Sequence, residues 1–220
     1  MAAVTDPQES LAAIRTLTAA ALAGMPTGEP AFDCLGVVAR ECGITARMAE
    51  DVIEGFALDA ADWHPRRESD LYQYCYHVAG AVGVMMAVVM GVPADDDATL
   101  DRACDLGLAF QLANIARDIA EDDAAGRCYL PDDWLAMLDI GPGEHMKPHN
   151  RKKLALMGRW LADEAEQYEA SARVGAARLP LRARWAVLSA AGIYGEIARK
   201  VRAADSHAWD QRIFTSRPEK

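Results

Sequence analysis

Apolar side chains recur every three or four residues along almost the whole sequence, and this spacing constrains the fold more than any other feature. Residues three and four apart share one face of an α-helix, so the spacing predicts helices that each bury one face. The alternating pattern of β-strands bounded by hairpin turns is not found in the sequence. We therefore predict an all-α chain folded as a helical bundle.

Capping and helix-breaking residues give approximate bounds for these helices. Asp6 followed by Pro7 marks the start of the first helix, and Thr45 marks the start of the third. The expected helices span residues 6–24, 29–43, 45–63, 69–91, 99–124, 151–178 and 180–204. The loops between them are short and no linker or repeat is seen, so residues 1–220 are predicted to form a single domain.

Charge and cysteine content narrow the class of protein. A net charge of -10 argues against nucleic-acid binding, although basic residues predominate from Arg178 onward. The five cysteines include no CxxC pair and indicate cytosolic thiols rather than a disulfide framework. The longest apolar run, residues 78–92, is shorter than the ~18 residues needed to cross a bilayer, and no export signal precedes it. We expect a cytoplasmic protein.

The expected helix at 99–124 carries amide and carboxylate side chains on one face. At about 100° per residue, four of them fall within an arc of roughly 80°, namely Gln111, Asn114, Asp118 and Asp122. Carboxylates one turn apart repel each other unless a cation neutralises them. Asp and Asn oxygens suit magnesium, which shares its other positions with water and substrate phosphates. The pattern predicts a magnesium–diphosphate site, with a solvated acidic helix end as the alternative.

Two flanking segments complete this pattern. Arg127 and Tyr129 follow the acidic stripe and could hold a phosphate, an ordinary turn being the alternative. Upstream, Val78, Val82 and Met86 share one apolar face of the expected helix at 69–91. Such a face is typical either of a buried core or of the wall of an apolar pocket.

Three motifs together resemble the squalene and phytoene synthase family, most closely its bacterial phytoene synthases: YCYHVAGAVGVMM at 74–86, LGLAFQLANIARDIAED at 106–122 and GRCYLP at 126–131. Weaker likeness at 53–59, 179–186 and 193–212 extends the resemblance over nearly the whole chain. The resemblance implies an isoprenoid-synthase-like helical bundle around a central cavity, with Mg²⁺ or Mn²⁺ as cofactor.

The resemblance also implies roles for the matching residues. Those implied in catalysis are Tyr74, Asp118 and Asp122. Those implied in holding the metal are Asn114, Asp118 and Asp122. Those implied around the diphosphates are Gln111, Arg117, Arg127, Tyr129, Tyr194 and Arg212. Those implied in the apolar cavity walls are Val78, Val82, Met86 and Phe110.

The implied reaction is the head-to-head condensation of two geranylgeranyl diphosphates, a step of carotenoid biosynthesis. It passes through a cyclopropylcarbinyl diphosphate and yields phytoene. The residues also leave open a squalene or dehydrosqualene synthase acting on farnesyl diphosphate, and a non-catalytic helical relative. The implied partner is a prenyl diphosphate, with no nucleic acid; peripheral contact with a membrane and association with carotenoid-pathway enzymes are left open.

The sequence departs from the family pattern near its N-terminus. The family has two aspartate-rich motifs, the first on an N-terminal helix, whereas the expected N-terminal helices here contain no DxxxD. The family also continues into a further helix past the position of Lys220. We therefore expect a partial bundle with one of two metal-binding walls, and no phytoene formation by these 220 residues alone.

Overall fold

The computed structural model describes residues 6–61 and 63–215, and every regular element in these ranges is helical. The elements are α1 (Pro7–Leu22), α2 (Pro30–Cys42), α3 (Ala46–Ala60), α4 (Glu68–Cys75), η1 (Tyr76–Gly80), α5 (Ala81–Val89), α6 (Asp97–Ala124), α7 (Asp132–Met137), η2 (Pro148–Asn150), α8 (Arg151–Ala176), α9 (Leu181–Ala204) and η3 (Asp205–His207). The all-α prediction is confirmed. The ends of the expected 1–220 domain, residues 1–5 and 216–220, lie outside the described residues, and the single-domain organisation stays a prediction.

Local capping explains where the first helices begin and end. The Asp6 side chain accepts a hydrogen bond from the backbone N–H of Gln8, and Pro7 occupies the first turn of α1. Thr45 caps α3 in the same way by accepting from the N–H of Met48. Each bond satisfies one of the backbone donors that a helix N-terminus leaves unpaired, so these two starts follow directly from the sequence.

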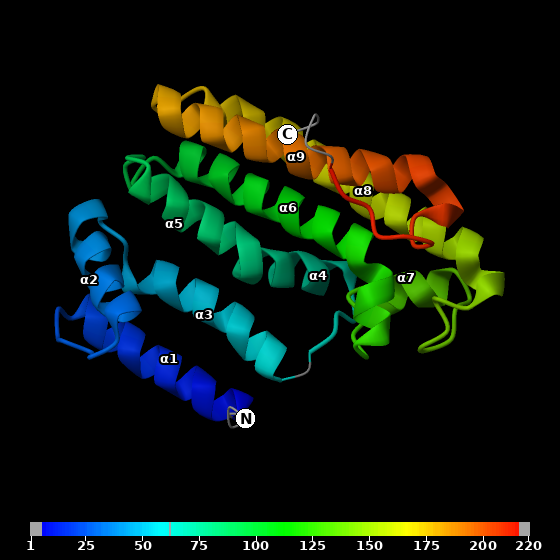
Figure 1. Ribbon diagram of the computed structural model, residues 1–220, viewed down its shortest axis with the longest axis horizontal. Helices are drawn as coiled ribbons and strands as arrows, with labels where there is room; N and C mark the ends of the chain where they lie inside the picture. The colour runs from blue at the N-terminus through cyan, green and yellow to red at the C-terminus, as the bar shows by residue number, and fades with distance from the viewer. Residues whose placement is uncertain (1–5, 62, 216–220) are drawn as a thin grey trace.

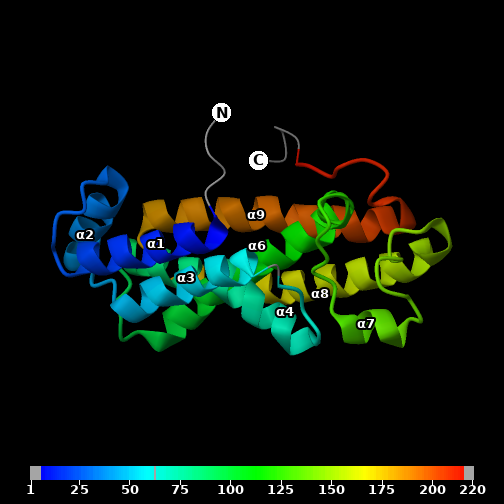
Figure 2. The same cartoon turned by 90° about the horizontal axis from the view of Figure 1, so that it is seen from below.

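Helix α6 is the central element of the bundle. It lies between α5 on one side and α8 and α9 on the other (Figure 1), and α1, α2 and α3 form a smaller group at one edge (Figures 1 and 2). The apolar face of α6 includes Leu112, which is fully buried, and it packs in one core cluster with Leu154 and Leu161 of α8. Burying each such leucine stabilises the fold by roughly 1.5–3 kcal/mol, so α6 is a rigid support for its polar face.

Two glycines allow α6 to touch η1 and α5 backbone to backbone. A Cβ added at Gly107 would lie 2.2 Å from the carbonyl oxygen of Ala79, and one added at Gly83 would lie 2.3 Å from that of Ala103. No real side chain tolerates such distances, so a larger residue at either position would force the two helices apart. The close approach fixes the relative position of two walls of the cavity described below.

The segment from residue 68 to residue 89 differs from the single helix expected over 69–91. A π-helical turn, η1, separates α4 from α5, and the N–H of Ala81 bonds to the carbonyl of Tyr76 five residues earlier. Both residues that enter this turn are held by α3: Tyr76 Oη donates to Asp51 at 2.8 Å, and His77 Nδ1 lies 2.8 Å from the Asp51 carbonyl oxygen. Long-range contacts of this kind override the local helical spacing.

The apolar run at 78–92 is only partly buried. Ala87 and Val88 are buried, while Val82 and Met86 keep a large exposed fraction because they face a cavity. Within residues 6–61 and 63–215, no helix combines the length and the apolar character needed to cross a membrane.

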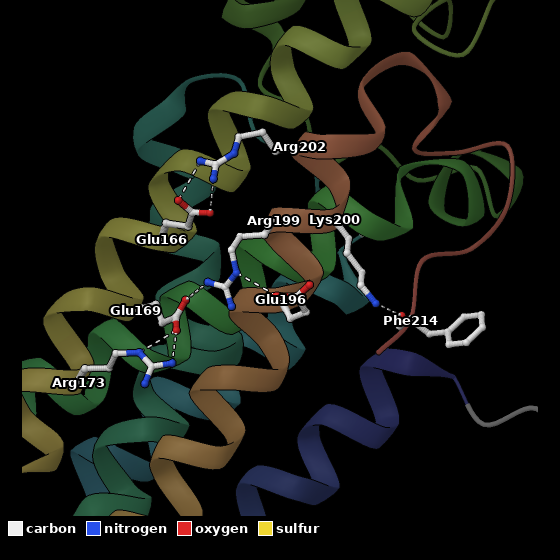
Figure 3. Close-up of polar contacts among 8 residues, drawn as sticks. All are labelled: Glu166, Glu169, Arg173, Glu196, Arg199, Lys200, Arg202 and Phe214. Carbon is white, nitrogen blue, oxygen red and sulfur yellow. Dashed lines mark hydrogen bonds and ion pairs between the residues drawn. The ribbon is translucent and has the colours of Figure 1, made fainter. Parts of the chain in front are cut away.

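Ion pairs join α8 to α9 along one seam (Figure 3). Glu169, whose side chain is 7% exposed, accepts from Arg173 at 2.6 Å and from Arg199 at 3.2 Å. Further along the seam, Arg202 contacts Glu166 at 2.8 Å. We call this set, residues 163–173 of α8 with 195–202 of α9, the α8–α9 seam.

Candidate active site

A cavity of about 520 Å³ lies between α5, α6, α8 and α9. This volume is within the range of small-molecule sites, and the walls are largely apolar, as expected for a pocket that accepts a hydrocarbon. The polar groups on the α6 and α9 walls include Gln111, Asn114 and Tyr194. The cavity therefore combines a long apolar surface with a polar edge, which suits an amphipathic ligand.

All four side chains predicted from sequence as cavity walls line this space, namely Val78, Val82, Met86 and Phe110. Phe110 of α6 stacks on Tyr194 of α9 with ring centroids 4.0 Å apart and planes 21° from parallel. This stack joins two helices that are far apart in the sequence. It places Tyr194, expected near a phosphate, directly beside the apolar wall.

The polar stripe of α6 runs from the cavity toward the end of the helix. Gln111 and Asn114 line the cavity, while Asp118 lies one turn beyond Asn114 and is not among the lining residues. Arg117 donates both to Asp118 Oδ1, at 2.7 Å, and to its second carboxylate oxygen, and Arg212 reaches Oδ1 at 3.0 Å. Two of the arginines expected around a diphosphate thus hold the same aspartate.

Asp122 lies in a different environment from Asp118. It lines a small second pocket together with Arg127, Tyr129 and the buried His145. Burial, and then the neighbouring Asp118 carboxylate, raises the pKa of Asp122 to about 6. The surrounding arginines only partly offset these effects, so an ionised Asp122 is poorly neutralised by the chain itself.

Tyr74, the tyrosine expected to act in catalysis, lies in a stack of three rings. Its ring is 5.1 Å from that of Trp63 and 5.0 Å from that of Tyr129. Its hydroxyl donates to Asp59 at 2.9 Å, and burial raises the pKa of Tyr74 above its ordinary value. The hydroxyl therefore stays protonated at neutral pH and is oriented by the Asp59 carboxylate.

The structure gathers the expected residues into adjoining groups rather than one cluster. Tyr74 touches Tyr129, which borders the pocket of Asp122, whereas Gln111 and Tyr194 face the large cavity. Sequence reasoning gave no role to Asp59 or Trp63, which orient Tyr74, or to Trp209, which contacts α6. Their partners are distant along the chain, so spacing carried no signal of these contacts.

The oxygen donors of α6 fit part of a magnesium shell. Asn114, Asp118 and Asp122 lie on one face of α6 and carry an amide oxygen and two carboxylates. Arginines contact both oxygens of Asp118, whereas the raised pKa of Asp122 indicates a carboxylate whose charge the chain leaves poorly neutralised. Magnesium usually takes one or two carboxylates and completes its shell with water and phosphate oxygens. In the described ranges, no three His, Cys, Asp or Glu side chains form a ready-made metal site. This donor set thus needs a phosphorylated ligand to complete it.

Solved structures place this fold among the helical synthases of isoprenoids. The chain is similar to a dehydrosqualene synthase crystallised with a ligand, at a TM-score of 0.85 and 28% identity, over 96% of this chain and 74% of that one. It also shares the fold of a squalene synthase from Alicyclobacillus acidocaldarius, at a TM-score of 0.81 and 21% identity, over 93% of this chain and 77% of that one.

The family model for squalene/phytoene synthase matches residues 1–219, and the chain therefore belongs to the squalene/phytoene synthase family. It is 49% identical to the phytoene synthase of Pseudescherichia vulneris, over 100% of this chain and 70% of that protein. It is 48% identical to the 15-cis-phytoene synthase of Pantoea ananas, over 99% of this chain and 70% of that protein. The resemblance and the fold expected from the sequence are confirmed.

Proposed function

We propose that this chain carries the active-site cavity of a phytoene synthase, a prenyltransferase that joins two geranylgeranyl diphosphates head to head. In the first half-reaction one diphosphate leaves, the resulting allylic cation adds to a double bond of the second prenyl chain, and loss of a proton closes the cyclopropane ring of a cyclopropylcarbinyl diphosphate. In the second half-reaction the remaining diphosphate leaves, the cyclopropylcarbinyl cation rearranges, and loss of a second proton gives phytoene, in a step of carotenoid biosynthesis. Identity of 48% and 49% to phytoene synthases over essentially the whole chain carries this proposal.

Asn114, Asp118 and Asp122 are the residues that would hold magnesium or manganese against the substrate diphosphate. The cation, when bound, neutralises the negative charge that develops on the departing diphosphate. Arg117 and Arg212 both contact the Asp118 carboxylate and orient it. In this proposal their positive charges also lie beside the diphosphate oxygens. These side chains supply binding and orientation along the polar face of α6, which begins at the cavity with Asn114 and continues beyond it.

The apolar walls protect the reacting carbons. Val82, Met86 and Phe110 line the cavity next to the polar edge and keep water away from an allylic cation. Excluding water matters because hydration would end the reaction as an alcohol. The Tyr74 hydroxyl, held protonated by burial and bonded to Asp59, belongs to the first half-reaction in this proposal.

Farnesyl diphosphate is the alternative substrate, because the chain is also 28% identical to a dehydrosqualene synthase of the same fold. The higher identity to phytoene synthases favours the longer prenyl chain. Contact with a membrane and with other carotenoid-pathway enzymes stays a prediction.

A product assay tests the proposed function. The chain is fused to the part of the Pseudescherichia vulneris relative that the match leaves out, and is incubated with Mg²⁺ and labelled geranylgeranyl or farnesyl diphosphate. Phytoene from the first substrate, at a higher kcat/KM than any product from the second, is the expected result. A preference for farnesyl diphosphate would reassign the substrate, and an equally active fusion with Asp118→Asn would overturn the assignment of the α6 site.

A further inference from the structure

The segment that follows α9 folds back over the bundle and carries Arg212. Helix α9 ends at Ala204, and Asp205 has a φ of 51°, a conformation that turns the chain sharply. The segment then runs back toward the middle of the molecule (Figure 1), and Arg212 lies 3.0 Å from Asp118 and 3.9 Å from Glu121. We call residues 205–215 the return segment.

The ion pair of Arg212 is too exposed to place the return segment by itself. The Arg212 side chain is 56% exposed, and ion pairs of this kind contribute roughly 0–1 kcal/mol. Other links are similar: Arg159 reaches Asp205 at 3.2 Å with both side chains about half exposed, and Lys200 donates to the Phe214 carbonyl at 3.2 Å (Figure 3). A more deeply buried contact must therefore fix where Arg212 lies.

Trp209 makes that buried contact. The side chain is in the core, with the residue 8% exposed, and its indole Nε1 donates to the carbonyl oxygen of Ala116 at 2.9 Å. Ala116 lies in the middle of α6, between the candidate metal-binding residues Asn114 and Asp118. The indole thus ties the return segment to the backbone of α6 two residues before the aspartate that Arg212 contacts.

Helix α8 is shaped to admit the indole. A Cβ added at Gly158 would lie 2.9 Å from both Cζ2 and Cη2 of Trp209, which is closer than real side chains approach. The ring is therefore held on one side by a hydrogen bond to α6 and on the other by the bare backbone of α8. Both contacts fix its position along the bundle.

We propose that Trp209 is a positioning residue that acts through Arg212. The indole sets where the return segment crosses α6, and three residues later the guanidinium of Arg212 meets Asp118. Without the indole hydrogen bond the return segment can shift, and Arg212 no longer faces the diphosphate oxygens at a fixed distance. The inference rests on the proposed function, because it assigns to Arg212 a part in holding diphosphate.

Trp209→Phe removes the indole N–H and keeps an aromatic ring in the core. Trp160→Phe is the matched control, since Trp160 also packs against the core, in an edge-to-face pair with Trp134. The first readout is limited trypsin cleavage after Arg212, followed by mass spectrometry of the C-terminal peptide. We expect cleavage to be about fivefold faster in Trp209→Phe, because the loss of one hydrogen bond changes the population of the open return segment by about that factor. In the control we expect cleavage to be less than twofold faster.

The second readout is the affinity for inorganic diphosphate with Mg²⁺, measured by calorimetry on the purified chain. We expect Trp209→Phe and Arg212→Gln each to weaken diphosphate binding about five- to tenfold. The double variant should bind diphosphate as tightly as Arg212→Gln alone, because both substitutions act through the same guanidinium. Gly158→Ala displaces the indole from the α8 side and is expected to weaken diphosphate binding as Trp209→Phe does. It replaces Trp209→Phe in the test if that variant folds poorly.

The outcomes separate this inference from the proposed function. The inference is overturned if Trp209→Phe leaves either cleavage after Arg212 or the affinity for diphosphate unchanged. It is also overturned if the effects of Trp209→Phe and Arg212→Gln on affinity multiply in the double variant. None of these results contradicts the proposed function, provided that the wild-type chain binds diphosphate with Mg²⁺. A wild-type chain that binds no diphosphate with Mg²⁺ would refute the functional role of both residues and count against the proposed function itself.

Discussion

The α8–α9 seam and the polar face of α6 differ in how completely arginines neutralise their carboxylates. In the α8–α9 seam, Glu169 is almost completely buried but has one arginine on each carboxylate oxygen (Figure 3). On α6, Asp118 is held by arginines, whereas the next aspartate, Asp122, is left with a pKa raised to about 6. Compensated charges hold helices together, while a carboxylate that the fold leaves poorly matched indicates a ligand that is not part of the chain.

The largest effect is expected from Asp118→Asn, which tests the α6 side of this comparison. The change keeps size and helix fit but removes the carboxylate that would hold the cation and that Arg117 and Arg212 share, so the active fusion should lose about 10²–10³-fold in kcat while it still melts cooperatively. Phytoene formation and circular dichroism melts measure the two properties. Arg182→Gln, on an exposed position of α9, is the control and should keep full activity.

The second effect is stabilisation by ligand. Mg²⁺ together with geranylgeranyl diphosphate should stabilise the chain by about 2.7 kcal/mol at a hundredfold excess over Kd, whereas either alone does little, because metal and phosphate complete one shared shell. Thermal melts with each component separately and with both check this. Equal shifts with and without metal would contradict the α6 donor set.

Glu169→Ala tests the α8–α9 seam. It leaves Arg173 and Arg199 without their shared carboxylate and should lower the free energy of unfolding by about 2 kcal/mol, less than for a fully buried pair because both arginines are about 40% exposed. Urea denaturation measures it. Glu196→Gln is the control, since Arg199 keeps Glu169 there, and diphosphate affinity should stay unchanged in both variants.

The smallest effect has the opposite sign. The pKa of Asp122 is about 6 in the folded chain, against an ordinary value of 3.8. Ionisation of Asp122 therefore lowers the free energy of unfolding, an effect that is absent below about pH 4 and complete above about pH 6. Asp122→Asn should therefore raise the free energy of unfolding without metal by about 1 kcal/mol at pH 8, after allowing for solvent screening, and by less at pH 5. If Asp122→Asn is less stable than wild type at pH 8, the Asp122 carboxylate is neutralised by its neighbours, as Glu169 is in the α8–α9 seam.

Local signals predicted much of the fold. The caps at Asp6 and Thr45 gave the starts of α1 and α3, and spacing gave the buried and polar faces of α6, because each depends on residues within one or two turns. The π-helical turn and the short helix α7 were missed. The turn depends on contacts with α3, and Trp134 in α7 is buried against Trp160, so neither can be inferred from neighbouring residues alone.

The candidate site was predictable to the same extent. The α6 stripe and the apolar face of Val78, Val82 and Met86 follow from helical spacing, and the structure places the latter on the cavity. The stacking of Phe110 on Tyr194 and the contact of Trp209 with Ala116 join residues about 80 to 90 positions apart. Such pairs depend on how whole helices pack, which a single sequence does not reveal.

The π-helical turn at Tyr76–Gly80 also has a consequence for inheritance. Such a turn is one residue richer than the α-helical turn it replaces, and each residue in a helix accounts for about 100° of rotation. It is therefore equivalent to a single inserted codon between Tyr74, which faces the aromatic stack, and Val82, which faces the cavity. Loss of one codon here would restore a regular α-helix and leave both side chains facing their present neighbours, whereas a second inserted codon would turn one of them away. A change of length in this stretch should thus be the loss of this one residue rather than a further gain.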